Sequence, residues 1–445
     1  MQISLSTANI LKTQFEDLYN DSSLSKLLLE GNLYEFEKLL HQKISDLYDK
    51  VGEAFLGQIS TSPEFVEAQK KLAAKEGLQK LAFRETNVRL RTGTKVTFSS
   101  LYAKTAPPNY DKSRLLCSAL WGVDMNCSPM YKSLNCLYSV LCPSFDVSKE
   151  LLNYQNIHAN FEKSRQASLS LAKDCICERS TIQLEKGESL LGKRVVIAMD
   201  GGRSRTRVYE EGKSGRNEKF STPWREPKMF VITTIDKDGK PEKKSKPIYD
   251  TTFGDDETFE LLGKYLKELE VEKAESVQFL ADGAVWIWNR VKPILMSLGL
   301  AENKIIETLD YYHAAEHVND MKVYFDKDKQ TGHFGLLKDA LWQGDFVEMT
   351  RLVKEGITGV DLEKFAPFKY FKKNQNRIDY QSLRGCNRPC GSGIIESGIR
   401  RIINLRFKSP STFWYPDNVE KLIFMRGVAL SGRWEIMMNN KFGSR

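Results

Sequence analysis

Three short apolar runs, each ending in an aspartate, constrain the fold more than any other feature of this sequence. They are RVVIAMDGG at 194–202, SVQFLADGA at 276–284 and KIIETLD at 304–310. The first two runs are apolar over several consecutive residues, as expected for buried strands, and the third is also predicted to be a strand. We therefore expect three strands, and each is predicted to end in a carboxylate.

Helical patterns alternate with these runs. The apolar spacing predicts three helices, at 255–270, 285–299 and 311–325. A fourth strand, KMFVITTID, is expected at 228–236, with RTRVYE at 205–210 as a candidate pairing partner. This order predicts an α/β (α+β) fold in which helices cover a mixed sheet.

The rest of the chain is predicted to be mainly helical. A hairpin is expected at 84–103, where apolar and polar residues alternate around a Gly-Thr turn. The polar stretch before residue 191 is interpreted as a boundary. The predicted regions are 1–103 (helical with a hairpin), 104–190 (helical DNA-binding or linker region), 191–325 (first part of the sheet-bearing core), 326–390 (helical insertion) and 391–445 (final acidic helix and C-terminal helix).

Charge and cysteine content limit the function classes. A net charge of +8 biases the chain toward polyanionic partners. The N-terminus lacks a secretory pattern and no window is apolar enough for a membrane span, so we expect a cytoplasmic protein. The irregular spacing of the eight cysteines favours small buried hydrophobes over a zinc site.

The strand-end aspartates predict a metal site. Ligands collect at the carboxyl ends of strands in such sheets, where Asp200 and Asp282 would repel each other. Divalent Mg²⁺ or Mn²⁺ would remove this repulsion, and two ions can activate an attacking oxygen and stabilise a leaving one. Gly201, Gly202 and Gly283 would let a phosphate backbone approach. The alternative is that each Asp-Gly is a turn or helix cap.

A third acidic candidate lies in GSGIIESGIRRIINLRF at 391–407, which is predicted to be a helix. Glu396 borders its apolar stripe, where such a residue is usually solvated or paired with Arg400. Between 364 and 408, however, eleven Lys or Arg stand against two acids, which fits a metal ligand among phosphate-binding residues.

A second basic segment, 203–228, has eight Lys or Arg against four Glu. It begins directly after the first aspartate and could hold a DNA backbone. Trp286, Trp288 and Trp414 are candidates for base stacking, although core packing is the favoured interpretation for each.

A competing motif is HAAEH at 313–317, which matches the H-x-x-E-H pattern of zinc peptidases. His313 and His317 would share one helix face, with Glu316 as general base. This interpretation leaves the strand-end aspartates and the basic segments unexplained.

Taken together, VVIAMDGG, FLADGAVWIWN, TLDYYHAAEHV, GSGIIESGIRRIINLRFKSPSTFW and MRGVALSGRWEIMM resemble the DDE transposases of bacterial insertion sequences, the ISKra-type and their Mutator-like relatives. The resemblance covers roughly 190–440. It implies a ribonuclease-H-like core with a helical insertion, and places the catalytic, metal-binding acids on Asp200, Asp282 and Glu396. Asp310 and His313 match the D-x-x-H element, with a positioning role.

The resemblance also implies DNA partners. The enzyme would cleave element ends and transfer strands with two Mg²⁺ (or Mn²⁺) ions, act as a homodimer or higher oligomer when two ends are paired, and associate with the nucleoid. A DNA-binding module is expected within 1–190. The alternative is an inactive, transposase-derived DNA-binding protein. The predicted DNA-binding residues are Arg203, Arg205, Arg207, Arg400, Arg401, Arg406 and Lys408.

Overall fold

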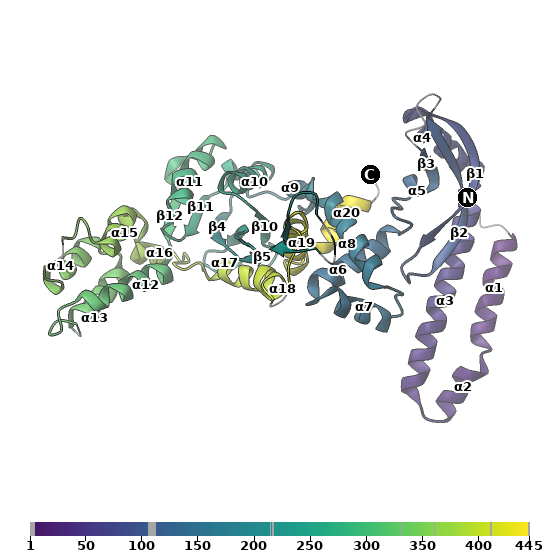
Figure 1. Cartoon of the computed structure of the whole chain (residues 1–445), viewed down its shortest axis with the longest axis horizontal. Helices are drawn as coiled ribbons and strands as arrows, with labels where there is room; N and C mark the ends of the chain where they lie inside the picture. Colours follow the sequence, from purple (N-terminus) through teal and green to yellow (C-terminus); the bar gives the residue numbers. More distant parts are fainter. Residues whose placement is uncertain are drawn as a thin grey trace. The chain divides into compact units, whose positions relative to one another are not determined.

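The computed structural model describes residues 5–105, 113–213, 215, 218–330, 332–359, 361–409 and 412–443. It divides into two compact units, Asp174–Lys441 and Met1–Lys173 with Phe442–Arg445 (Figure 1). None of the helices in these described ranges is long and apolar enough to cross a membrane.

The first unit combines helices with a small sheet. Its long hairpin pairs β1 with β2 from Arg89↔Lys95 at the turn to Leu78↔Thr105 at the open end, so it extends beyond the predicted 84–103. Gly93, with a φ of 81°, makes the turn. The elements are α1 (Leu5–Tyr19), α2 (Ser22–Leu29), α3 (Leu33–Ser60), α4 (Pro63–Lys75), β1 (Leu78–Arg89), β2 (Lys95–Thr105), β3 (Ser113–Leu115), α5 (Leu116–Leu120), α6 (Pro129–Leu141), α7 (Phe145–Tyr154) and α8 (Phe161–Ile176).

The second unit is built on a five-stranded mixed sheet. Its strands are β4 (Arg194–Gly201), β9 (Lys228–Ile235), β10 (Ile248–Thr252), β11 (Ser276–Ala281) and β12 (Ile305–Leu309). Their order is β10-β9-β4-β11-β12. Strand β9 runs antiparallel to β10 and β4, whereas β11 is parallel to both β4 and β12. The unit is therefore of the mixed α/β class.

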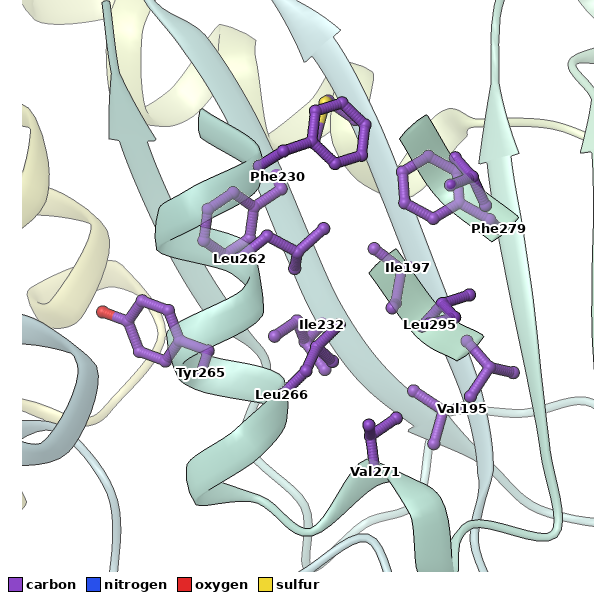
Figure 2. Packing of buried hydrophobic residues seen from close by; sticks show 14 of the residues in the cluster. Val195, Ile197, Phe230, Ile232, Leu262, Tyr265, Leu266, Val271, Phe279 and Leu295 are labelled. Atoms are coloured by element: carbon purple, nitrogen blue, oxygen red, sulfur yellow. The ribbon is translucent and has the colours of Figure 1, made fainter. Parts of the chain in front are cut away.

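Helices α10 (Asp255–Glu268) and α11 (Val285–Ser297) cover one face of this sheet. Acidic residues in the first turn of α10 favour its N-terminus, because they face the positive end of the helix dipole. One stripe of α10, which includes Leu262 and Leu266, points toward Ile197 and Ile232 of the sheet (Figure 2). Each fully buried side chain of this kind stabilises the fold by about 1.5–3 kcal/mol.

The segment after β12 is helical and has a core of its own. It comprises α12 (Tyr311–Met321), the short η3 (Lys322–Tyr324), α13 (Gly332–Gln343), α14 (Phe346–Gly356), α15 (Ala366–Asn374), η4 (Gln375–Arg377) and α16 (Tyr380–Gly385). Leu309 at the end of β12 belongs to this core, as do Phe368 and Phe371 of α15. We call 326–390 the helical insertion; it packs on the end of the sheet through this shared core.

The predicted helix at 391–407 consists of three consecutive segments, α17 (Gly393–Gly398), the π-helix η5 (Ile399–Asn404) and α18 (Leu405–Phe407). The predicted apolar stripe is buried. Helix α17 contacts β4 and β9, and α19 (Pro416–Leu430) contacts β10 on the second face of the sheet. The chain ends in α20 (Trp434–Phe442).

Two expectations differ from the structure. The predicted partner of β9 was 205–210, but β9 pairs with β4 and with β10, a strand that the sequence analysis did not identify. The segment 205–210 instead lies in two short ladders, in which β5 (Ser204–Arg205) pairs with β8 (Trp224–Arg225) and β6 (Val208–Tyr209) pairs with β7 (Phe220–Ser221). Strand β10 is short and carries an aspartate, which explains why its apolar pattern is weak.

The second unit also begins earlier than the predicted boundary at 190, because residues 174–190 are tied to it by buried polar contacts. Arg179, in the single-turn helix α9 (Arg179–Ile182), is held by Asp250 and Glu420. Arg433 donates to the carboxylate of Glu188, with 2.7 Å between Nη2 and Oε1. These ion pairs link the segment to β10, to α19 and to the turn between α19 and α20.

Candidate active site

The three strand-end aspartates lie at one end of the sheet, where the carboxyl ends of the parallel strands are found. Asp200 is the next-to-last residue of β4, Asp282 directly follows β11, and Asp310 directly follows β12. These three strands are adjacent and parallel, so their carboxyl ends meet. The sheet topology thus gathers carboxylates that are far apart along the chain.

The loop that carries Asp282 is held by two hydrogen bonds at the start of α11. The Asp282 carboxylate accepts a hydrogen bond from the Ala284 amide at 2.9 Å. Its carbonyl accepts one from the indole Nε1 of Trp288 at 2.7 Å. The first turn of α11 therefore determines where the Asp282 carboxylate points.

Glu396 reaches the same end of the sheet from the first turn of α17, where its side chain is exposed. The Ser392 hydroxyl lies 3.3 Å from Glu396 Oε1, and the Ser392 amide donates to Asp310 Oδ2 at 2.8 Å. Ser392 therefore joins the start of α17 to the end of β12. It was not among the predicted site residues.

The charges of Asp282 and Glu396 act on the Asp200 carboxyl. Burial raises the pKa of the Asp200 carboxyl, and the adjacent Gly201 amide opposes that effect. The negative charges of Asp282 and Glu396 raise this pKa further. The charge of His313 opposes this effect. Because like charges disfavour simultaneous ionisation, a bound cation would stabilise the ionised acids.

Asp310 and His313 form a second polar group beside these acids. Asp310 is buried and caps α12, because its Oδ1 accepts from the amides of Tyr312 and His313 at 2.6 and 3.2 Å. Interaction of the His313 ring with the Asp310 carboxylate, which accepts from it, raises the pKa of His313 to about 9. Burial alone would raise the pKa of Asp310, but its hydrogen bonds with His313 and Ser392 lower it. Asp310 therefore serves as the N-cap of α12.

Two sets of residues could hold divalent ions. Among the described residues, Asp310, His313 and Glu396 form the one group whose ligand atoms all lie within 4.8 Å of one another. Asp200, Asp282 and Glu396 are more widely spread. Two ions about 3.5–4 Å apart need their outer ligands separated by more than a single ion would, so a wider spread suits a two-ion site. The hard oxygen donors of the wider set fit Mg²⁺ or Mn²⁺.

The peptidase interpretation does not match the arrangement of HAAEH. His313 lies beside Asp310, with 3.8 Å between Nδ1 and Oδ2. The ring of His317 instead lies against Tyr370, with 3.9 Å between centroids. The compact ligand group contains neither His317 nor Glu316.

The basic residues divide into exposed and enclosed groups. Arg205 and Arg207 lie over aromatic rings, at 5.3 Å from Trp224 and 4.4 Å from Tyr415 respectively. Arg406 is only 3% exposed and lies 4.8 Å from the ring of Trp414, so it offers no guanidinium to a ligand in this structure. The exposed side chains are those of Arg203, Arg400, Arg401 and Lys408.

The tryptophans pack into the protein. Trp288 and Trp414 are 7% and 8% exposed, which leaves little ring surface for a base. Trp286 is half-buried, with Lys228 above its ring at 4.7 Å. Core packing, the favoured interpretation, describes Trp288 and Trp414.

The glycines after the aspartates serve the protein's own packing, which corrects the expectation that they admit a phosphate backbone. A Cβ on Gly201 would overlap the Glu226 carboxylate, and one on Gly202 would meet Ile403 at 2.6 Å. A Cβ on Gly283 would overlap the ring of Tyr370. In each case a side chain from another segment fills the space.

Comparisons with known proteins identify no family for this chain. No protein-family profile matches the sequence, and no curated protein matches it. Among solved structures, the chain has a weak likeness to the Drosophila P element transposase strand transfer complex. The identity is 14% and the TM-score 0.29, over 74% of this chain and 84% of that one. At this score the likeness does not establish a shared fold.

Proposed function

We propose that this chain is a DNA transposase of the DDE type, which cleaves and joins phosphodiester bonds with two divalent ions held by Asp200, Asp282 and Glu396. The observation that supports the proposal is the sheet topology, which brings Asp200 and Asp282 to the carboxyl ends of adjacent parallel strands, where the charges of Asp282 and Glu396 both act on Asp200. Three antiparallel strands followed by two parallel ones are compatible with the ribonuclease-H-like core that the sequence resemblance implies.

The bound ions would supply activation of the attacking oxygen and stabilisation of the leaving oxygen. The chain's own residues hold the carboxylates in place. Ser392 fixes the start of α17, and with it Glu396, against Asp310. The hydrogen bond from Trp288 fixes the loop of Asp282.

DNA is the proposed partner. Arg400 and Arg401 are exposed on the segment that directly follows Glu396, and they would contact phosphates next to the reacting group. The net charge of +8 favours a polyanion of this kind. Pairing two element ends would require at least two copies of the chain.

The test is nicking of a supercoiled plasmid that carries the DNA from both sides of the gene, with Mn²⁺ or Mg²⁺ added. We expect wild-type protein to nick it, and Asp200→Asn, Asp282→Asn and Glu396→Gln each to lose activity by about 1,000-fold, because several kcal/mol of charge stabilisation are removed. Binding to the same DNA should remain.

The matched control is Asp256→Asn, an exposed aspartate of α10 that pairs with Arg290. This variant should nick as wild type does. Full activity in all three site variants would refute the catalytic assignment. Specific DNA binding without nicking by the wild type would favour the inactive, DNA-binding alternative.

A further inference from the structure

The helical insertion contacts the loop of Asp282 through Tyr370 of α15. The edge of its ring fills the space where Gly283 would carry a Cβ, so the two residues are in direct contact. On its other side the ring lies against His317 of α12, with centroids 3.9 Å apart and planes inclined by 34°. Tyr370 is thus wedged between α12 and the loop after β11.

Gly283 directly follows Asp282, so this contact bears on a proposed metal ligand. Burial raises the pKa of the Tyr370 hydroxyl, and the negative charges of Asp282 and Asp310 raise it further. The hydroxyl therefore stays protonated at neutral pH and lies within the field of the acidic site. The Asp282 loop is restrained by α11 through Trp288 and by the helical insertion through Tyr370.

The core of the insertion holds Tyr370 in this position. The neighbouring Phe371 is 1% exposed, and its ring meets that of Tyr370 edge-on at 5.3 Å. Asn374 donates to the Tyr370 carbonyl at 2.9 Å, which fixes the last turn of α15. A shift of the insertion core would consequently be transmitted to the loop of Asp282.

We propose that Tyr370 is a positioning residue, through which the helical insertion sets the Asp282 loop for metal binding. The inference rests on the proposed function, since it concerns the same acidic site. It assigns the insertion a part in assembling that site. We assign this role to the ring, because its edge occupies the space above Gly283.

Removing the ring should weaken metal binding. For Tyr370→Ala we expect the Mn²⁺ dissociation constant, measured by isothermal titration calorimetry on the full chain without DNA, to rise by about 10-fold or more, as for other residues that support metal ligands. The Mn²⁺ concentration for half-maximal plasmid nicking should rise in parallel. The KM for the plasmid should be unchanged, because Tyr370 is not proposed to bind DNA.

Tyr370→Phe keeps the ring and should restore both values to near those of the wild type. The matched control is Tyr324→Ala, which removes a ring that meets Phe365 edge-on and is 51% exposed. It should leave Mn²⁺ affinity unchanged. If Tyr370→Ala fails to fold, Tyr370→Leu provides the same measurement.

A double-mutant cycle tests the contact itself. Gly283→Ala should raise the Mn²⁺ dissociation constant, because the added methyl overlaps the tyrosine ring. In the Gly283→Ala/Tyr370→Ala double variant the overlap is gone, so its affinity should be no worse than that of the poorer single variant. Contacting residues are expected to be non-additive in this way.

The outcomes separate the two proposals. A wild-type chain that neither binds Mn²⁺ nor nicks DNA overturns the proposed function, and the inference with it. A wild-type chain that does both, while Tyr370→Ala binds Mn²⁺ with the same affinity, overturns the inference alone. Additive losses in the double variant would also contradict it.

Discussion

The aspartates of the sheet differ in burial and in partners, as a comparison of Asp250 with Asp200 and Asp282 shows. Asp250 of β10 is 1% exposed, accepts hydrogen bonds from the Thr251 amide and the Tyr265 hydroxyl at 2.7 Å each, and has Arg179 at 3.7 Å. Asp200 and Asp282 are only half-buried and accept from nearby amides. No ion pair within the described ranges involves either of them; Lys228, opposite Gly201, pairs instead with Glu226.

The difference separates a structural carboxylate from one that is prepared for a ligand. A buried acid with its own donors and a guanidinium is complete within the fold. Asp200 forms no ion pair within the described ranges. The charges of Asp282 and Glu396 raise its pKa and that of His313 lowers it, so part of its charge is left for another partner. Since both groups are strand aspartates, burial and partners distinguish them where residue type does not.

The largest expected effect on stability is at Asp250, whose partners all come from the fold. Asp250→Ala should lower the free energy of unfolding by about 3–5 kcal/mol, because it leaves Arg179 with one buried partner fewer. Asp282→Ala should leave stability unchanged or slightly raised, since it relieves like-charge crowding. Urea unfolding followed by circular dichroism measures both. Equal losses in the two variants would erase the comparison.

The pH dependence of stability gives a slightly smaller effect. Burial raises the pKa of Asp250 from 3.8 to about 6, despite Arg179. A carboxyl with a raised folded-state pKa contributes stability that is fully present below 3.8 and is lost as pH rises through about 6.

The matched variant is Asp250→Asn, which cannot ionise. Relative to it, the wild type should lose about 3 kcal/mol between pH 3.5 and pH 7, at 1.36 kcal/mol per pKa unit. Unfolding midpoints measured across this range test the sign. A wild type that gains stability over the variant as pH rises would show that Arg179 outweighs burial.

Added metal should distinguish the strand-end acids. At a Mn²⁺ concentration about 100 times its dissociation constant, the wild type should gain about 2.7 kcal/mol of stability, because the ion binds the folded state. Asp282→Asn should lose this gain and Asp250→Asn should keep it. Thermal unfolding with and without Mn²⁺ provides the measurement. A gain that survives Asp282→Asn would place the ion elsewhere.

The smallest effect is expected at Ser392, which is 4% exposed and whose hydroxyl donates to Asp310 and lies beside Glu396. Ser392→Ala should cost about 1.5 kcal/mol of stability through the lost charge-assisted hydrogen bond. Nicking should also fall, since Glu396 would be less constrained. The control is Ser382→Ala. The bond from Ser382 to Asp379 is donated by its backbone amide, so the substitution keeps it. Unchanged activity in Ser392→Ala would limit this serine to a structural role.

Local patterns predicted the strands and their ends, because a continuous apolar run and its terminal aspartate are visible within nine residues. The sheet order explains why Asp200, Asp282 and Asp310 meet. Glu396 borders an apolar stripe as the helical spacing indicated, yet that spacing alone favoured a solvated residue. The sequence resemblance, rather than periodicity, singled it out.

Long-range contacts could not be predicted in this way. Nothing around Tyr370 indicates that its ring fills the space above Gly283, and the short β10 gives too weak a signal to compete as the partner of β9. Arg406 belongs to a basic run, but its position after a π-helical segment turns it toward Trp414. These features depend on which distant segments meet, and a single sequence does not state that.

The most direct measurement is a crystal structure of the full chain soaked in Mn²⁺, with the ions located by anomalous scattering. The account predicts two peaks about 3.5–4 Å apart, coordinated by Asp200, Asp282 and Glu396. A single peak on Asp310, His313 and Glu396, with none near Asp200 and Asp282, would contradict it.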